Sequence, residues 1–398
     1  MKKNKIKVLD DIKEVKSLDN KNYIFSDDEK SYSSKKIKRN KKTNLCINNI
    51  NINDKCKTTT SKHLKIISFQ NILKKIIKVS SISEKGTKNI NQDNYLLKEN
   101  IFNIKDFSIF SVFDGHGIDG HYISKIAKEE FLDYFTNNTN LYYIPRRNET
   151  IISLKSNETL NKYITTEEIY NRLSYNNYKI IRNIYIQTDN ILKKKDYDSD
   201  FSGSTSCSLF IIGKHIICSN LGDSRAILIK NSNEIVNLSN DHKPNNKKEY
   251  ERIIKKGGEI RKNSLDLNEY NNNINENNIY EIIPFRIYFK NENFPGLAMS
   301  RSIGDFIAKK IGVVNEPEIF DYNICDDDKF IILASDGLWE FVSNEDARNI
   351  VNLYYSQCNL NKAIEELISF AKKKFLQIGS YVDDITIILI FLNVQNDL

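Results

Sequence analysis

Three carboxylates of this sequence stand where an apolar run begins or ends. The runs and their acids are Phe107–Phe113 with Asp114, Phe330–Ser335 with Asp336, and Ile385–Phe391 with Asp383. Such short β-branched and aromatic runs, bounded by Gly and Asp, indicate buried strands. Acids at the ends of buried strands collect negative charge at one edge of a sheet, which is unfavourable unless a cation neutralises it. The pattern therefore predicts a divalent metal held by oxygen ligands.

The neighbours of these acids suggest which metal and which chemistry. Oxygen ligands favour hard octahedral ions such as Mg²⁺ or Mn²⁺ over zinc. Gly115 has no side chain, so its carbonyl can approach a metal closely, and His116 is a better candidate for proton transfer than for metal binding. A single Asp-Gly pair usually marks a turn, but three acids in matching positions favour the metal site. The phosphate-binding motif G-x-x-x-x-G-K-[ST] does not occur, so nucleotide binding through such a loop is not favoured.

Positive charge is concentrated at the beginning of the chain. Residues 1–78 contain 21 Lys and Arg against 8 Asp and Glu, whereas residues 79–398 contain 38 against 44. We therefore expect no nucleic-acid binding by the mildly acidic body. The sequence has no apolar run long enough for a transmembrane segment, and its charged start leads us to expect no secretory signal. The six scattered cysteines fit a reducing compartment, so we expect a protein of the cytoplasm or nucleus that is not secreted. We also expect it to be a monomer.

Composition and periodicity divide the chain into a basic extension, residues 1–78, and a body, residues 79–398. The extension is rich in Lys, Asn and Ser, which is typical of disorder. Asn-rich insertions near 137–165 and 262–282 interrupt the body. Helical spacing predicts helices over Tyr122–Phe135, Ile169–Leu192, Lys247–Lys256, Glu345–Ser356 and Lys362–Leu376, and further strands are predicted at Thr205–Gly213, His215–Cys218 and Ala226–Lys230. Antiparallel runs of strands with helices clustered between them favour a layered α+β body.

Nine motifs follow one another along this body. They are Gly86 with Asn91-Gln-Asp93, Val112-Phe-Asp-Gly-His-Gly117, Ser202-Gly-Ser-Thr-Ser206, Asn220-Leu-Gly-Asp-Ser-Arg225, Asp241-His-Lys-Pro244, Glu251-Arg-Ile253 with Gly257-Gly258, Gly296-Leu-Ala-Met-Ser-Arg-Ser-Ile-Gly-Asp305, Ala334-Ser-Asp-Gly-Leu-Trp339 and Val382-Asp-Asp-Ile-Thr386. In this order they resemble the metal-dependent serine/threonine protein phosphatases of type 2C, the PPM family. The resemblance extends from about residue 80 to the C-terminus, interrupted by the two insertions.

The resemblance implies an α+β fold in which a central antiparallel β-sandwich is flanked by helix pairs on both faces. It also implies two Mg²⁺ or Mn²⁺ ions, with a weaker third, and phosphoprotein substrates. Phosphoserine or phosphothreonine would be hydrolysed by a water that bridges the two ions, without a phosphoenzyme. By motif position, Asp114 would bridge both metals, and Gly115 would ligate one of them through its carbonyl. Asp336 and Asp383 would complete the other metal, Asp93 would hold a metal-bound water, and Asp223 with Asp336 would bind the third ion. His116 would protonate the leaving oxygen.

Two positions depart from the commonest form of the family. Lys88 stands where many members carry an Arg that grips the phosphate; it supplies the charge without the bidentate fork. Gln92 stands where Glu is common, and it can hydrogen-bond a metal-bound water without adding charge. We interpret both as changes that tune the site, and we interpret Asp305 as a local structural acid.

Two other hypotheses remain open at this point. A catalytically inactive scaffold of the same fold would be indicated by loss of a metal acid, and every expected acid is present. A basic adaptor that binds nucleic acid through residues 1–78 would show salt-sensitive binding that disappears on truncation.

Overall fold

The computed structural model describes residues 77–138, 165–262 and 283–392, all within one compact unit. Of the predicted basic extension, residues 1–78, the structure describes only Ile77 and Lys78. Lys78 is the first residue of the first strand. The two predicted insertions also lie outside them, apart from a few residues at their edges.

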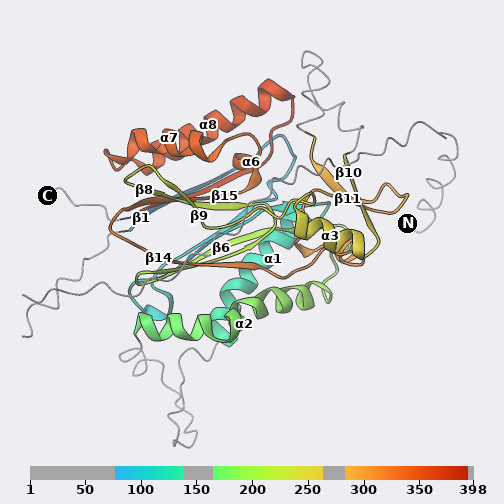
Figure 1. Cartoon of the computed structure of the whole chain (residues 1–398), viewed down its shortest axis with the longest axis horizontal. Coiled ribbons are helices and arrows are strands. Elements are labelled where there is room, and N and C mark those ends of the chain that lie inside the picture. Colours follow the sequence, from blue (N-terminus) through green and yellow to red (C-terminus); the bar gives the residue numbers. More distant parts are fainter. Residues whose placement is uncertain (1–76, 139–164, 263–282, 393–398) are drawn as a thin grey trace, which may run out of the picture. The chain divides into compact units, whose positions relative to one another are not determined.

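Ten strands form two five-stranded sheets in which every neighbouring pair is antiparallel (Figure 1). The first sheet has the order β1 (Lys78–Glu84), β16 (Ile385–Phe391), β15 (Asp328–Ala334), β8 (Arg225–Lys230), β9 (Ile235–Asn237). The second has the order β14 (Glu318–Asn323), β7 (His215–Leu221), β6 (Ser206–Ile212), β3 (Phe107–Phe113), β2 (Asn94–Lys98). The three strands predicted between residues 205 and 230 are β6, β7 and β8.

The central strands of the two large sheets are buried on both faces. All seven residues of β6, β7 and β16 are buried, as expected for strands that are packed on both sides. One buried cluster contains Phe110 and Leu209 of the second sheet together with Leu333 and Ile388 of the first. The predicted combination of helices with antiparallel sheets is confirmed.

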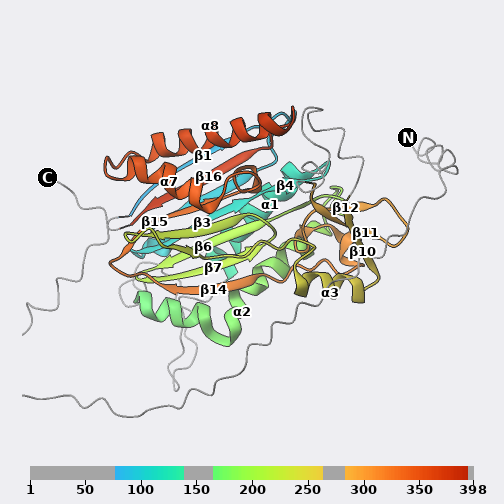
Figure 2. The ribbon, with the colours of Figure 1, turned by 45° about the horizontal axis from the view of Figure 1, so that its top comes forward.

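Five helices pack against the two large sheets. α1 (Gly120–Asp133) and α2 (Thr166–Leu192) share a buried cluster with residues of the second sheet. α6 (Asp336–Trp339), α7 (Asn344–Tyr355) and α8 (Leu360–Ile378) share another with residues of the first sheet. Figure 2 shows α8 and α2 on opposite sides of the strands. In the described part of the chain, no helix is both long and apolar enough to cross a membrane.

The predicted helices agree with the observed ones to within a few residues, with one internal difference. α2 contains a break at Tyr175–Tyr178, where three consecutive residues have positive φ. Helical spacing alone does not reveal this break, because the apolar residues on both sides of it remain buried.

Smaller elements surround the ends of the large sheets. They are a three-stranded sheet with the order β13 (Ile303–Gly304), β5 (Gly203–Ser204), β4 (Gly115–His116); the short helix η2 (Ile101–Asn103); and the π-helical turn η3 (Tyr134–Asn138). A separate small core joins α3 (Lys247–Lys255), β10 (Gly258–Lys262), β11 (Phe285–Phe289), β12 (Pro295–Leu297) and α5 (Phe306–Lys309). We call this group the β10–β12 subdomain.

Candidate active site

Strand pairing brings the predicted acids together in two pairs. Asp336 follows β15 and Asp383 precedes β16, and these two strands are antiparallel neighbours with Ala334 opposite Ile387. In the other sheet, Asp93 precedes β2 and Asp114 follows β3, and Asn94 lies opposite Phe113. In an antiparallel pair the end of one strand lies beside the start of the next, so each pair of acids occupies one end of its sheet.

The electrostatics show that the two pairs form one cluster. Burial raises the pKa of Asp93 to about 8, and the charges of Asp383 and Asp384 add to this effect. Burial, followed by the charges of Asp93 and Asp383, also raises the pKa of Asp114. The pKa of Asp336 is raised by burial and then by Asp114 and Asp223. Buried carboxylates that repel one another hold protons unless a cation stabilises their charged form.

The donor chemistry of this cluster fits a hard divalent cation. Asp93 Oδ2 accepts a hydrogen bond from Ser335 at 2.8 Å, while its Oδ1 is buried without a hydrogen-bond partner. Asp223 Oδ1 is likewise buried and unpaired. Within the ranges that the structure describes, no three His, Cys, Asp or Glu side chains already stand in a geometry that could hold a metal ion. The acids are therefore gathered and rich in oxygen donors, but they are not a preformed cage.

Gly115 and Gln92 are packed tightly against each other. A Cβ at Gly115 would lie 2.4 Å from the Gly120 carbonyl oxygen and 2.5 Å from that of Gln92, so only glycine fits here. The Gln92 side-chain amide donates to the Gly117 carbonyl at 2.6 Å. In this structure the side chain of Gln92 therefore ties two loops of the site together.

Lys88 lies at the rim of the cluster. Its Nζ is 2.6 Å from Asp383 Oδ1. Burial lowers the pKa of Lys88, but the charge of Asp383 outweighs that effect and raises it above the ordinary lysine value. The loop that carries Lys88 is held by Asp384, which is buried and accepts hydrogen bonds from the backbone N–H groups of Gly86 and Gln92 at 2.8 and 2.9 Å.

His116 has a carboxylate partner that the sequence did not reveal. Its Nε2 is 2.7 Å from Asp305 Oδ2, and its Nδ1 is buried without a hydrogen-bond partner. Burial lowers the pKa of His116, but Asp305 outweighs that effect and raises the pKa above its ordinary value. Our interpretation of Asp305 as a local structural acid was incomplete, because 189 residues separate it from the histidine that it contacts. The only available signal was its place at the end of a family-like motif.

Lys243 is a second residue that sequence reasoning missed. Its Nζ is 2.7 Å from Asp223 Oδ2 and 3.4 Å from Glu340 Oε2. Asp223 is almost completely buried, so Lys243 compensates a charge that would otherwise be costly. The structure thus places all eight predicted site residues around one cluster and adds Asp305 and Lys243.

Comparison with known proteins agrees with this architecture. The serine-threonine phosphatase 2C from Toxoplasma gondii has a similar fold, with a TM-score of 0.60 at 20% identity over 79% of this chain and 95% of that one. The sequence profile described as Protein phosphatase 2C matches residues 77–375. The Arabidopsis thaliana proteins named "Probable protein phosphatase 2C 72" and "Probable protein phosphatase 2C 73" are 31% and 32% identical to this chain. Each alignment covers 79% of this chain, with 85% and 79% of those proteins.

The fold is therefore that of a serine/threonine phosphatase. The chain belongs to the protein phosphatase 2C family, as its nine motifs predicted.

Proposed function

We propose that this protein is a metal-dependent phosphatase that hydrolyses phosphoserine and phosphothreonine in proteins without forming a phosphoenzyme. The observation that carries the proposal is the cluster formed by Asp93, which is buried, with Asp114, Asp336 and Asp383, which are half-buried. Burial and mutual repulsion raise the pKa of the first three, so bound divalent cations would stabilise their ionised forms. A catalytically inactive relative would have no need to keep such a costly group of acids.

The residues present fit Mg²⁺ or Mn²⁺. Two ions would be held by oxygen donors, namely the carboxylates of Asp93, Asp114, Asp336 and Asp383 and the carbonyl of Gly115. Asp223 together with Asp336 would hold a third ion more weakly. When bound, ions of this kind make a coordinated water acidic enough to attack phosphorus and stabilise charge on the phosphoryl group.

The chain's own residues would orient the substrate and move the proton. The Lys88 ammonium would attract the phosphoryl oxygens. His116, whose protonated form is favoured by Asp305, would donate a proton to the departing Ser or Thr oxygen. Cys207 and Cys218 are buried in the cluster shared by the two large sheets, which supports a mechanism without a cysteine nucleophile.

The finer architectural predictions belong to the same proposal. We propose the layer order helix, sheet, sheet, helix, which is supported by the three core clusters: one shared by the two sheets and one between each sheet and its helices. We also propose that residues 79–398 form the catalytic domain and that residues 1–78 are an extension to it.

The test is hydrolysis of a phosphothreonine peptide with added Mn²⁺. We expect turnover that chelation abolishes, and we expect Asp114→Asn and Asp336→Asn to reduce it by several orders of magnitude. Circular dichroism would show that the variants remain folded. Full activity of either variant, or turnover that persists in chelator, would refute the mechanism. A folded wild-type protein that binds no Mn²⁺ and hydrolyses nothing would instead be the inactive scaffold.

A further inference from the structure

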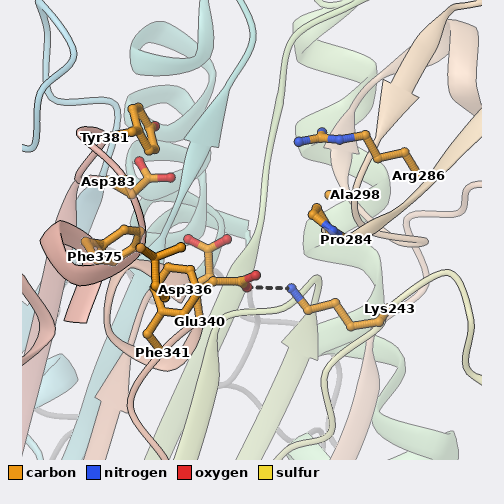
Figure 3. A pocket seen from close by; sticks show the side chains of 12 residues that line it. Lys243, Pro284, Arg286, Ala298, Asp336, Glu340, Phe341, Phe375, Tyr381 and Asp383 are labelled. Atoms are coloured by element: carbon orange, nitrogen blue, oxygen red, sulfur yellow. Dashed lines mark hydrogen bonds and ion pairs between the residues drawn. The ribbon is translucent and has the colours of Figure 1, made fainter. Parts of the chain in front are cut away.

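A cavity of about 150 Å³ opens directly beside the carboxylate cluster (Figure 3). Asp336 and Asp383 form part of its lining, so the cavity is continuous with the candidate active site. Figure 3 shows that its opposite wall carries Pro284, Arg286 and Ala298, which come from the β10–β12 subdomain and the residues next to it. The cavity thus lies between that subdomain and the acids.

Much of the remaining wall is apolar. It is formed by Phe341, after α6, by Phe375 and Ile378 of α8, and by Tyr381. The rings of Phe341 and Phe375 meet edge to face with their centroids 4.7 Å apart. An enclosed apolar cavity of about 150 Å³ can hold benzene. The cavity here is open on one side and lined partly by charged groups, but its volume and its apolar wall leave room for a phenyl or branched aliphatic side chain.

The cations in the wall already have partners within the protein. Lys243 is paired with Asp223 and with Glu340, as Figure 3 shows. Arg286 donates to the Gly296 carbonyl at 3.0 Å. An acidic occupant would also meet Glu340 close to Lys243. The charges therefore do not favour a charged occupant, whereas apolar surface is buried favourably in such a site.

We propose that this cavity is a specificity subsite that binds an apolar side chain, aromatic or branched aliphatic, next to the phosphorylated Ser or Thr of the substrate protein. The inference rests on the proposed phosphatase function. Because the cavity shares Asp336 and Asp383 with the carboxylate cluster, a residue close to the phosphoresidue in sequence can reach it while the phosphoryl group lies at the acids. Ile378 and Ala298 act as specificity-determining residues, since they line the cavity from its two sides without belonging to the acid cluster.

The experiment compares phosphothreonine peptides that have alanine at every flanking position with peptides that carry one Phe or Leu at each flanking position in turn. We expect a preference in kcat/KM of roughly 10- to 100-fold at one position, the range given by burying one such side chain. Ile378→Ala removes apolar surface and Ala298→Leu fills the space, so each is expected to lower that preference. Leu376→Ala is the matched control, because Leu376 lies on the same helix, is 58% exposed and does not line the cavity.

The outcomes separate this inference from the proposed function. Equal kcat/KM for all flanking residues, with turnover intact, would overturn the subsite and leave the phosphatase function standing. A preference that survives both variants, or one that Leu376→Ala lowers equally, would also overturn it. Absence of turnover on every peptide and on p-nitrophenyl phosphate, which has no flanking residue, would refute the phosphatase function and the subsite together.

Discussion

Replacing Asp305 by Asn tests whether this residue positions the proton donor. Asp305 is buried and its Oδ2 lies 2.7 Å from His116 Nε2. Its φ of 50° is left-handed, a conformation that Asn tolerates well. The substitution therefore removes the negative charge while preserving the size and backbone of the residue.

The expected magnitude follows from the type of hydrogen bond that is lost. A hydrogen bond to a charged group contributes about 1.5–3 kcal/mol and a neutral one about 0.5–1.5 kcal/mol. The difference of about 1–1.5 kcal/mol corresponds to a roughly 5- to 15-fold slower step. The loss should appear in kcat for a phosphothreonine peptide, because its alkoxide leaving group needs a proton. Turnover of p-nitrophenyl phosphate should change little, because its leaving group departs as a stable anion.

A double mutant provides the control. If Asp305 acts through His116, adding Asp305→Asn to His116→Gln should cost no further activity. Steady-state kinetics of the wild type, both single variants and the double variant, on both substrates, measure this. Equal losses on the two substrates would show that Asp305 has a purely structural role, and additive losses would show that it acts independently of His116.

Two further predictions concern packing and acid stability. Gly115→Ala should abolish measurable Mn²⁺ binding by calorimetry, because its Cβ would meet two carbonyl oxygens. Gly257→Ala is the control: its φ of 84° makes the substitution cost backbone strain, but its new Cβ meets no atom within 4 Å, so Mn²⁺ binding should remain. Equal binding by both variants would contradict the packing argument. Burial raises the pKa of Glu249, but hydrogen bonds from Arg301 and Arg252 outweigh the effect of burial and hold the pKa well below the ordinary Glu value. Ionised Glu249 therefore contributes stability at pH values above the ordinary Glu pKa, and this stability is lost as the pH falls towards the pKa of Glu249 in the folded protein. Glu249→Gln should therefore lower the stability by about 2 kcal/mol near neutral pH and make thermal melting less sensitive to acid, and an unchanged acid sensitivity would refute this assignment.

Much of the fold could be predicted because the strongest signals are local. Continuous apolar runs such as Ile385–Phe391 are buried on both faces, and that burial is written into their composition. Helices such as α1 and α8 have apolar positions at helical spacing. Acids next to strand ends could be grouped because antiparallel strands bring their ends together.

The missed residues depend on contacts between distant segments. Asp305 is 189 residues from His116, and the Lys243 side chain reaches Glu340 across 97 residues. No periodicity or local motif encodes such a pairing, since it exists only once the β10–β12 subdomain and the two large sheets have been placed. The cavity beside the acids has the same origin, because its two walls come from separate parts of the chain.

The structure also gives a reason for Gln92 at a position where Glu is common. An ionised carboxylate can only accept hydrogen bonds, whereas an amide can donate. The Gln92 amide donates to the Gly117 carbonyl at 2.6 Å, a contact that an ionised Glu could not make. Gln92 thus connects the loop that precedes β2 to the loop that follows His116, and it leaves one negative charge fewer beside the acids of the site.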